Sequence, residues 1–533
     1  MLVLHLAPFV LFSPGTLLPQ GSGPSTTRVS VDSAGVQGNG DSWSPSISAD
    51  GRFVAFESRA GNLVPGDMGF EDVFVHDRQT GQTTRVSVDS AGVPGNSDSE
   101  FGSISADGRF VAFSSFANNL VPGDTHAYSD VFVHDRQTGQ TTRVSVDSAG
   151  APGAGNSYLP SISAGGRFVA FASFAANLVQ GDTGFFKDVF VHDRQTGQTT
   201  RVSVDSAGIQ GNHSSEDPSI SADGRFVAFY SYASNLVPGD TSGVYDVFVH
   251  DRQTGQTTRV SVDAAGVQGN RGSYDPTISA DGRFVAFESE ASNLVPDDTN
   301  SRYDVFVHDH QTGQTTRVSV NSAGAQGNHN SEDPSISADG RFVAFGSYAA
   351  NLVPGDAGIY GDVFVHDRQT AQTIRVSVDS AGVQGNSDSY GPSISADGRF
   401  VALASGASNL VPGDTNGSGD VFVHDRGTGL TLVPLGNCPG PMTFTAYHAA
   451  PGATVAFVWG TSGSSTIPPG YPCAGTQLGL SPLRTPPPGY LLATADSSGT
   501  ATASGTAPRA ACGVVLLQAV DLTSCETSNK VSF

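Results

Sequence analysis

A phrase of eleven residues, SISADGRFVAF, recurs seven times along the chain and limits what it can fold into. The copies begin at Ser46, Ser103, Ser161, Ser219, Thr277, Ser335 and Ser393, some with one residue changed, so the period is 57 to 58 residues. A period of this length is typical of chains built from one supersecondary unit that cannot bury its apolar faces alone. The repeat therefore predicts one obligate domain of seven stacked units.

Each copy contains four short β-type runs. In the second copy, residues 103–105 and 109–114 are joined by ADG, while DVFVHD from Asp130 is joined to TTRVSV from Thr141 by RQTGQ. Both connections are short and carry turn residues. Four strands per unit predict a propeller blade. We expect an all-β chain, with a seven-bladed β-propeller of four-stranded blades at residues 23–435 and a small β-sandwich module at 436–533.

The two ends of the repeat suggest how the ring closes. Residues 26–32 read as a fourth strand that lacks its first three, and we expect them to form the outer strand of the last blade. LTLVPLG, after Asp425, reads as a degraded fourth strand. In the third copy Gly165 replaces the turn aspartate, so that turn should differ slightly. The long links, which vary between copies, should all lie on one face, where function is expected.

Charge and targeting signals restrict the partners. The formal net charge is −23 and the only lysines are Lys187 and Lys530, so we expect no nucleic acid and no anionic membrane surface among the partners. Residues 1–22 begin with an apolar run that prolines interrupt, which resembles a signal peptide. No later segment has the composition of a membrane span. We expect a secreted, periplasmic or cell-surface protein that is a monomer.

All four cysteines follow the repeats. Their spacing matches no CxxC metal motif, so we expect disulfides in an exported module, with the pairing left open among Cys438, Cys473, Cys512 and Cys525.

An aspartate pair recurs around the second loop of every copy. Two copies, DTNSRYD and DTNGSGD, resemble oxygen-ligand loops for calcium. The alternative is that the first aspartate shapes the turn and the second orients the third strand. No cofactor is required by this interpretation. Calcium is a possible bound ion, and its candidate ligands are Asp298, Asn300, Asp304, Asp414, Asn416 and Asp420.

Seven histidines recur in the third strand, each followed by aspartate, from His76 to His424. Rotational symmetry separates equivalent positions, so they cannot converge on one metal, and we expect them to be hydrogen-bonded inside their blades. We expect the arginines after each ADG, such as Arg109, to pair with blade aspartates.

Positions that differ between copies are more informative. Three residues before each first strand, where the link should reach the central opening, the chain has Trp43, Glu100, Tyr158, Glu216, Tyr274, Glu332 and Tyr390. The loops add Phe70, Tyr128, Phe185, Phe186, Tyr245, Tyr303 and Tyr360. Mixed aromatic and acidic side chains suit carbohydrate, peptide or cationic ligands, and the alternative is that they cap the blades.

The repeat resembles the WD-like propeller repeat of the TolB type, whose core phrase SPDGxxhAF…DhahhDhxTG stands here as SADGRFVAF and DVFVHDRQTG. That resemblance implies protein or ligand binding in the cell envelope. Neither Trp43 nor Trp459 forms a WD dipeptide, so the eukaryotic WD repeat matches less well.

Neither GxSxG nor HExxH occurs, and we expect no catalytic residues. The expected function is a non-catalytic exported propeller that binds a protein, peptide or glycan on its variable-loop face. The alternatives are a polysaccharide lyase or glycosidase using loop-face carboxylates, with Glu216 and Glu332 as candidates, or a purely structural cell-surface component.

Overall fold

The computed structural model describes residues 24–427, apart from Met68, Ser242 and Ala357, and the strands between Thr431 and Ser532. Every regular element in these residues is a β-strand, and none of them forms a helix that could cross a membrane. One compact unit comprises Ser25–Arg426, and the strands from Thr431 onward belong to a second.

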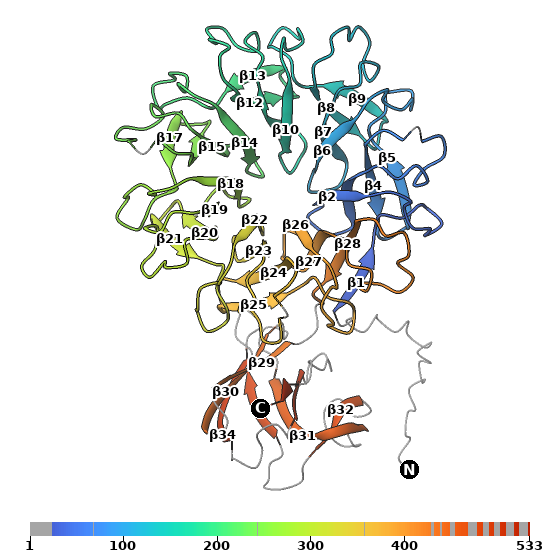
Figure 1. The fold of residues 1–533 in the computed structure, drawn as a ribbon, viewed down its shortest axis with the longest axis vertical. Coiled ribbons are helices and arrows are strands. Elements are labelled where there is room, and N and C mark those ends of the chain that lie inside the picture. Colours follow the sequence, from blue (N-terminus) through green and yellow to red (C-terminus); the bar gives the residue numbers. More distant parts are fainter. Residues whose placement is uncertain are drawn as a thin grey trace, which may run out of the picture. The chain divides into compact units, whose positions relative to one another are not determined.

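The first unit is a ring of seven four-stranded antiparallel sheets, here numbered blades 1 to 7 (Figure 1). The innermost strands are β2 (Ser42–Ile47), β6 (Ser99–Ile104), β10 (Ser157–Ile162), β14 (Ser215–Ile220), β18 (Ser273–Ile278), β22 (Ser331–Ile336) and β26 (Ser389–Ile394). The second strands are β3 (Phe53–Ser58), β7 (Phe110–Ser115), β11 (Phe168–Ser173), β15 (Phe226–Ser231), β19 (Phe284–Ser289), β23 (Phe342–Ser347) and β27 (Phe400–Ser405).

The third strands are β4 (Asp72–Asp77), β8 (Asp130–Asp135), β12 (Asp188–Asp193), β16 (Asp246–Asp251), β20 (Asp304–Asp309), β24 (Asp362–Asp367) and β28 (Asp420–Asp425). The outer strands are β5 (Gln82–Arg85), β9 (Gln140–Arg143), β13 (Gln198–Arg201), β17 (Gln256–Arg259), β21 (Gln314–Arg317), β25 (Gln372–Arg375) and, in blade 7, β1 (Ser25–Arg28). The seven-bladed propeller expected from the sequence is confirmed.

The N-terminal strand closes the ring. β1 pairs antiparallel with β28, with Thr27 opposite Val423, and the amide of Val29 donates to the carbonyl of Val421 (2.9 Å). The prediction that residues 26–32 supply the outer strand of the last blade is therefore confirmed, and we call this strand the latch. The segment read as a degraded fourth strand is different: Thr431–Gly436 is β29, which pairs with β30 of the second unit because β1 already occupies the outer edge of blade 7.

A closed circle of backbone hydrogen bonds also joins the blades. In each ADG turn the alanine amide donates to the carbonyl of the equivalent alanine in the next blade, at 3.0–3.1 Å. The series runs through Ala49, Ala106, Ala164, Ala222, Ala280, Ala338 and Ala396, whose amide donates back to the carbonyl of Ala49. Blade 7 is thus linked to blade 1 by the same bond that joins every other pair.

The hydrophobic core lies between blades. Each of its seven clusters combines residues of two neighbours; in one, Ala55 and Val73 of blade 1 pack with Val111, Phe113 and Leu120 of blade 2. The third strands DVFVHD are buried along their whole length because both of their faces meet a neighbouring blade. No blade can bury its apolar surface alone, as the repeat predicted.

The ADG turn requires its glycine. Gly108 has φ +71°, and a Cβ there would lie 2.1 Å from the Phe53 ring of the preceding blade. In the third copy, Gly166 has φ +69° and its amide still donates to the carbonyl of Ser163 (2.8 Å). The turn that carries Gly165 therefore keeps the common backbone, and only the bonds of the missing aspartate are lost.

In the second unit, β29 (Thr431–Gly436), β30 (Gly440–Tyr447) and β34 (Ala501–Ala507) form one sheet. The other sheet comprises β31 (Thr454–Thr466), β32 (Gln477–Pro482), β33 (Tyr490–Thr494), β35 (Leu516–Asp521) and β36 (Val531–Ser532). The sandwich arrangement stays a prediction. The expected signal peptide at 1–22 and the four cysteines, Cys438, Cys473, Cys512 and Cys525, lie outside the described residues.

Candidate functional site

The seven residues expected to surround the central opening lie inside the innermost strands, not before them. Each is the second residue of its strand and pairs with the fifth residue of the second strand, as Tyr274 does with Glu288 and Glu216 with Tyr230. The strands begin earlier than predicted because a β-bulge follows this residue, so pairing resumes three residues later. Six of the seven are half-buried, and Tyr390 is 45% exposed.

The residue after each of these has left-handed backbone geometry in all seven blades. The φ values lie between +47° and +57°, and the residues are Ser44, Phe101, Leu159, Asp217, Asp275, Asp333 and Gly391. Aspartate tolerates this conformation, but serine, phenylalanine and leucine adopt it here as well. The three adjacent acids of blades 4 to 6 are therefore not required by the backbone.

These acids form a cluster with a fourth from the second strand of blade 5. Carboxylate oxygens of Asp275, Glu288 and Asp333 all lie within 4.8 Å of one another, and Glu288 accepts a hydrogen bond from the amide of Asp333 (3.0 Å). Burial, followed by the charge of Asp275, raises the pKa of Glu288 to about 8. Burial and the carboxyl group of Asp275, through charge and a hydrogen bond, raise the pKa of Asp217 well above its ordinary value.

A continuous row of aromatic rings crosses blades 3 to 5 beside these acids. Phe186 stacks on His213 (4.5 Å between ring centroids), His213 contacts Tyr232 (4.7 Å), and Tyr232 contacts Tyr245 (5.1 Å). Tyr245 also contacts Tyr274 (5.4 Å). Of these, Phe186 and Tyr245 come from strand two-to-three loops, so loops and innermost strands meet on one face.

Two further tyrosines join the row to the acids. Tyr230 packs edge-on against Tyr274 (5.6 Å), and Tyr303 lies 6.2 Å from Tyr274. Burial, then the charges of Glu216, Asp217 and Asp275, raise the pKa of Tyr230. Burial, then Glu290 and Tyr274, raise the pKa of Tyr303 to about 12. We call the combined surface the acidic–aromatic patch, defined by Asp217, Asp275, Glu288, Asp333, Tyr230, Tyr245, Tyr274 and Tyr303.

Other members of the predicted ring have local partners. Lys187 of blade 3 pairs with Glu216, and Asn330 donates to Glu332 (2.9 Å). In blade 1, Trp43 Nε1 donates to Glu57 (2.8 Å), and Arg59 lies over the Trp43 ring. Glu100, Tyr158 and Tyr390 occupy equivalent positions in blades 2, 3 and 7.

The loop aspartate pairs are bound by the chain itself. In blade 5, Gln326 Nε2 donates to Asp298 and Asp304 (2.8 Å each), and Arg317 Nη1 lies 3.4 and 3.7 Å from them. Asn300 also presents its amide N–H group to Asp304 (3.1 Å).

In blade 7, Gln37 donates to both Asp414 (2.7 Å) and Asp420 (3.1 Å), Arg28 lies 3.2 Å from Asp420, and Asn416 Nδ2 lies 3.5 Å from it. The N–H groups of glutamine, arginine and asparagine side chains occupy the space next to the carboxylates in which a calcium ion would bind. N–H groups cannot coordinate a cation, so this set of side chains does not fit calcium. Calcium binding at these six residues stays a prediction that this geometry does not favour.

In blade 2, Pro152 stands where five of the other six links carry the glutamine, and His126 of the loop lies against the aspartate pair instead. His126 Nδ1 lies 3.4 Å from Asp124 and 3.7 Å from Asp130, while Arg143 Nη1 donates to His126 Nε2 (3.1 Å). The arginine bond places the ring proton on Nδ1, where it faces the carboxylates. His126 therefore presents an N–H group toward the pair without forming a hydrogen bond to it, and its ring offers no free ligand atom on that side.

The opposite face is closed by its own bonds. Arg109 forms a bidentate pair with Asp135 (2.9 and 2.6 Å), and the Phe110 ring lies between Arg109 and Arg194. His134 is buried, and its Nδ1 is hydrogen-bonded to the hydroxyl of Thr141 (2.9 Å). Equivalent arginine pairs and histidine bonds recur in all seven blades. The structural roles expected for the strand-three histidines and the turn arginines are confirmed.

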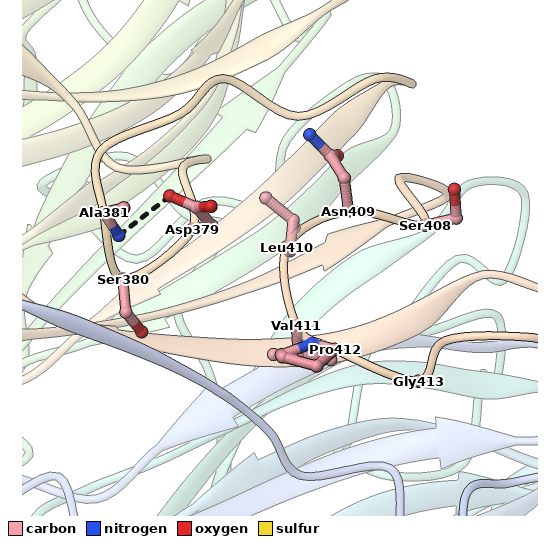
Figure 2. A pocket seen from close by; sticks show the side chains of 9 residues that line it. All are labelled: Asp379, Ser380, Ala381, Ser408, Asn409, Leu410, Val411, Pro412 and Gly413. Atoms are coloured by element: carbon pink, nitrogen blue, oxygen red, sulfur yellow. Dashed lines mark hydrogen bonds between the residues drawn. The ribbon is translucent and has the colours of Figure 1, made fainter.

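A small pocket recurs between links and loops. Figure 2 shows the one lined by residues 379–381 and 408–413, with a volume of about 530 Å³, and an equivalent pocket of about 620 Å³ is lined by residues 89–91 and 118–123. Asp379 accepts the amide hydrogens of Ala381 and Val383, and Asn409 donates to the carbonyl of Gln384. These polar groups are used within the turns and leave little for a ligand.

No family model and no curated protein matches the chain. Among solved structures it is similar to TolB from Acinetobacter baumannii, with 16% identity over 63% of each chain and a TM-score of 0.34. It is also similar to an acylaminoacyl peptidase from Pyrococcus horikoshii, with 10% identity over 78% of this chain and 59% of the other, and a TM-score of 0.44. Both matches span less than two thirds of the other chain.

Proposed function

We propose that this protein is a non-catalytic scaffold that binds a protein or peptide partner on its variable-loop face, in the cell envelope or outside the cell. The observation that carries the proposal is the unbroken aromatic row from Phe186 to Tyr303, drawn from three blades onto one face. Tyrosine rings in contact with one another supply large, rigid contact area at low entropic cost, which is typical of binding surfaces.

The contrast between the two faces supports the same proposal. The short-turn face has nearly the same sequence in every copy, and its charged side chains are bonded within the turns: Arg109 pairs with Asp135, and Arg136 donates to the carbonyl of Gly108. The variable-loop face carries the residues that differ between copies, including Phe185, which is 81% exposed. A partner would find chemical variety on that face alone.

The test is a binding screen of the purified full chain on peptide and glycan arrays. We expect saturable binding that the triple variant Tyr245→Ala, Tyr274→Ala, Tyr303→Ala weakens by about tenfold or more. The matched control replaces the exposed turn residues Gln79, Gln137 and Gln195 by alanine and should bind as the parent does. If the control variant loses binding and the tyrosine variant keeps it, the binding site lies on the short-turn face and the proposal is wrong.

One observation favours a second candidate, a glycosidase. Asp275, Glu288 and Asp333 bring carboxylate oxygens within 4.8 Å, and the raised pKa of Glu288 keeps a proton on one acid at neutral pH. Glycoside hydrolysis uses one protonated and one ionised carboxyl group close together. Release of reducing ends from glycans by the parent, abolished in Asp275→Asn, would favour this candidate over the scaffold.

A further inference from the structure

Resting on the proposed function, we propose that the acidic–aromatic patch recognises a cationic segment of its partner, with a lysine or arginine side chain placed between Asp217, Asp275 and Asp333 and its aliphatic stem against the tyrosines. Asp217, Asp275 and Asp333 have no lysine or arginine partner among the described residues. Tyrosine rings lie directly beside them.

Elsewhere in the repeat three sets of acids are paired with a basic side chain, although among the described residues Glu57, Glu100 and Glu332 have no such ion pair. Every third-strand aspartate of the Asp135 type has its arginine, every loop aspartate pair has an arginine from the outer strand, and Glu216 has Lys187. Within the described residues, neither lysine nor arginine forms an ion pair with Asp217, Asp275, Glu288 or Asp333. The patch is therefore a place where the described part of the chain gathers four carboxyl groups and supplies no basic side chain to pair with them.

The fold does not account for these acids. The same left-handed bulge is built with Ser44 and Leu159 in other blades, and the position of Glu288 is filled by alanine, serine, glycine or tyrosine in five of the seven blades. Gathering like charges lowers stability. Charge complementarity with a partner is the gain that offsets this loss.

The neighbouring rings determine the chemistry of the cation. Tyrosine faces attract ammonium and guanidinium groups, and the methylene stem of lysine or arginine packs well on aromatic rings. Tyr230 and Tyr274 lie beside the acids, while Tyr245 and Tyr303 extend the surface past them. A bare metal ion would use the carboxylates and leave this row without a role, so we commit to a polypeptide segment.

The experiment selects peptides from a random octapeptide display library against the immobilised full chain, then measures the affinity of the selected sequences by fluorescence anisotropy. We expect lysine or arginine at one or more fixed positions, and norleucine at that position should weaken binding at least about tenfold, the size of one lost charge-assisted hydrogen bond. Affinity should also fall as salt is raised.

Two matched variants locate the site. Asp275→Asn removes one charge in a residue type that keeps the left-handed backbone, and it should weaken binding about tenfold. Asp297→Asn removes one charge from an exposed left-handed position in the loop of the same blade, and should change affinity less than about twofold. Melting curves of both variants confirm that they are folded.

Three results would overturn the proposal. Selected peptides without a basic residue, or equal affinities for the parent and Asp275→Asn, would leave the scaffold function standing and remove the cationic ligand. Stoichiometric binding of calcium alone that is lost in Asp275→Asn, and that the selected peptides do not displace, would make the patch a metal site. A chain that binds no peptide at all contradicts the proposed function itself.

Discussion

In the acidic–aromatic patch, Glu288 keeps its proton at pH values at which the same side chain is ionised in the unfolded chain, and this difference lowers the stability of the fold as the pH rises. Glu288 is 8% exposed, and its pKa of about 8 lies far above the ordinary value of 4.5. In the unfolded chain this carboxyl group ionises near pH 4.5, whereas in the folded chain it keeps its proton until about pH 8. The folded state therefore binds more protons in this window, and its stability falls as the pH rises from 4.5 through 8.

The variant Glu288→Gln removes this titration while its amide oxygen can still accept the hydrogen bond from Asp333. We expect the parent and the variant to melt alike near pH 4.5, and the variant to be more stable at pH 8 by on the order of 2 kcal/mol. Thermal unfolding at a series of pH values measures the difference. A stability difference that is the same at both pH values would contradict the raised pKa.

At the scale of the element, the copies differ by small defects that the other copies identify. In six blades the serine that opens the repeated phrase accepts a hydrogen bond from an isoleucine amide of the next blade, as Ser46 does from Ile104 (3.1 Å). Thr277 stands at this position in blade 5, and its hydroxyl is buried without a partner. The second heavy atom on Cβ restricts the χ1 rotamers of threonine more than those of serine.

We expect Thr277→Ser to restore the bond to Ile336 and to raise the free energy of unfolding by about 1 kcal/mol. Chemical denaturation of the parent and variant is the measurement. The control is Ser219→Thr, which makes the opposite change in the neighbouring blade and should lower stability by a similar amount. If both substitutions act in the same direction, the hydroxyl bond is not the cause.

Gly165 is a second defect of this kind. In the other copies the turn aspartate accepts two bonds, as Asp107 does from the hydroxyl of Ser105 (2.7 Å) and the amide of Arg109 (3.0 Å). A Cβ at Gly165 would meet nothing within 4 Å. Gly165→Asp should therefore stabilise the protein by about 1 kcal/mol, through the two bonds and the lower entropy of the unfolded chain. An unchanged or lower melting temperature would contradict this account.

The elements also explain which parts of the site could be predicted. The repeat period and the turn residues predict the seven four-stranded blades. The isolated fourth-strand sequence at residues 26–32 predicts the strand that closes the ring. Comparison of the copies identifies Glu216, Tyr274 and Glu332. It does not identify Asp217, Asp275 and Asp333, which follow them directly, because the β-bulge that changes their direction has no recognisable sequence signal in a single copy. A signal was present in the varying residue before the proline of SEDP and SYDP. The arginine and glutamine partners of the loop aspartates depend on tertiary contacts that spacing does not reveal.

At the scale of the whole molecule, closure depends on a strand that comes from the far end of the chain. Val29 is 1% exposed and packs with Ala402, Val421 and Val423 of blade 7. Ser30 donates to Asp420 (2.6 Å), and Arg28 pairs with the same carboxylate. Blade 7 is therefore complete only when both ends of the repeat are present.

A chain shortened to begin at residue 33 should melt at a markedly lower temperature, because blade 7 loses its outer strand and exposes buried valines. A synthetic peptide of residues 25–32 added in trans should restore much of that loss, measured as a concentration-dependent rise in melting temperature. The same peptide with Val29→Asp serves as the control and should not. No loss of stability on truncation would contradict the role of β1.

The latch also has a consequence for how separate molecules can become joined. β1 carries STTR where the other outer strands carry QTTR or QTIR, and all seven third strands read DVFVHD. Nothing in its sequence ties β1 to the third strand of its own chain. In a concentrated solution of partly unfolded molecules, the N-terminal strand of one can complete the last blade of another, and repeated exchange would give open chains of linked rings.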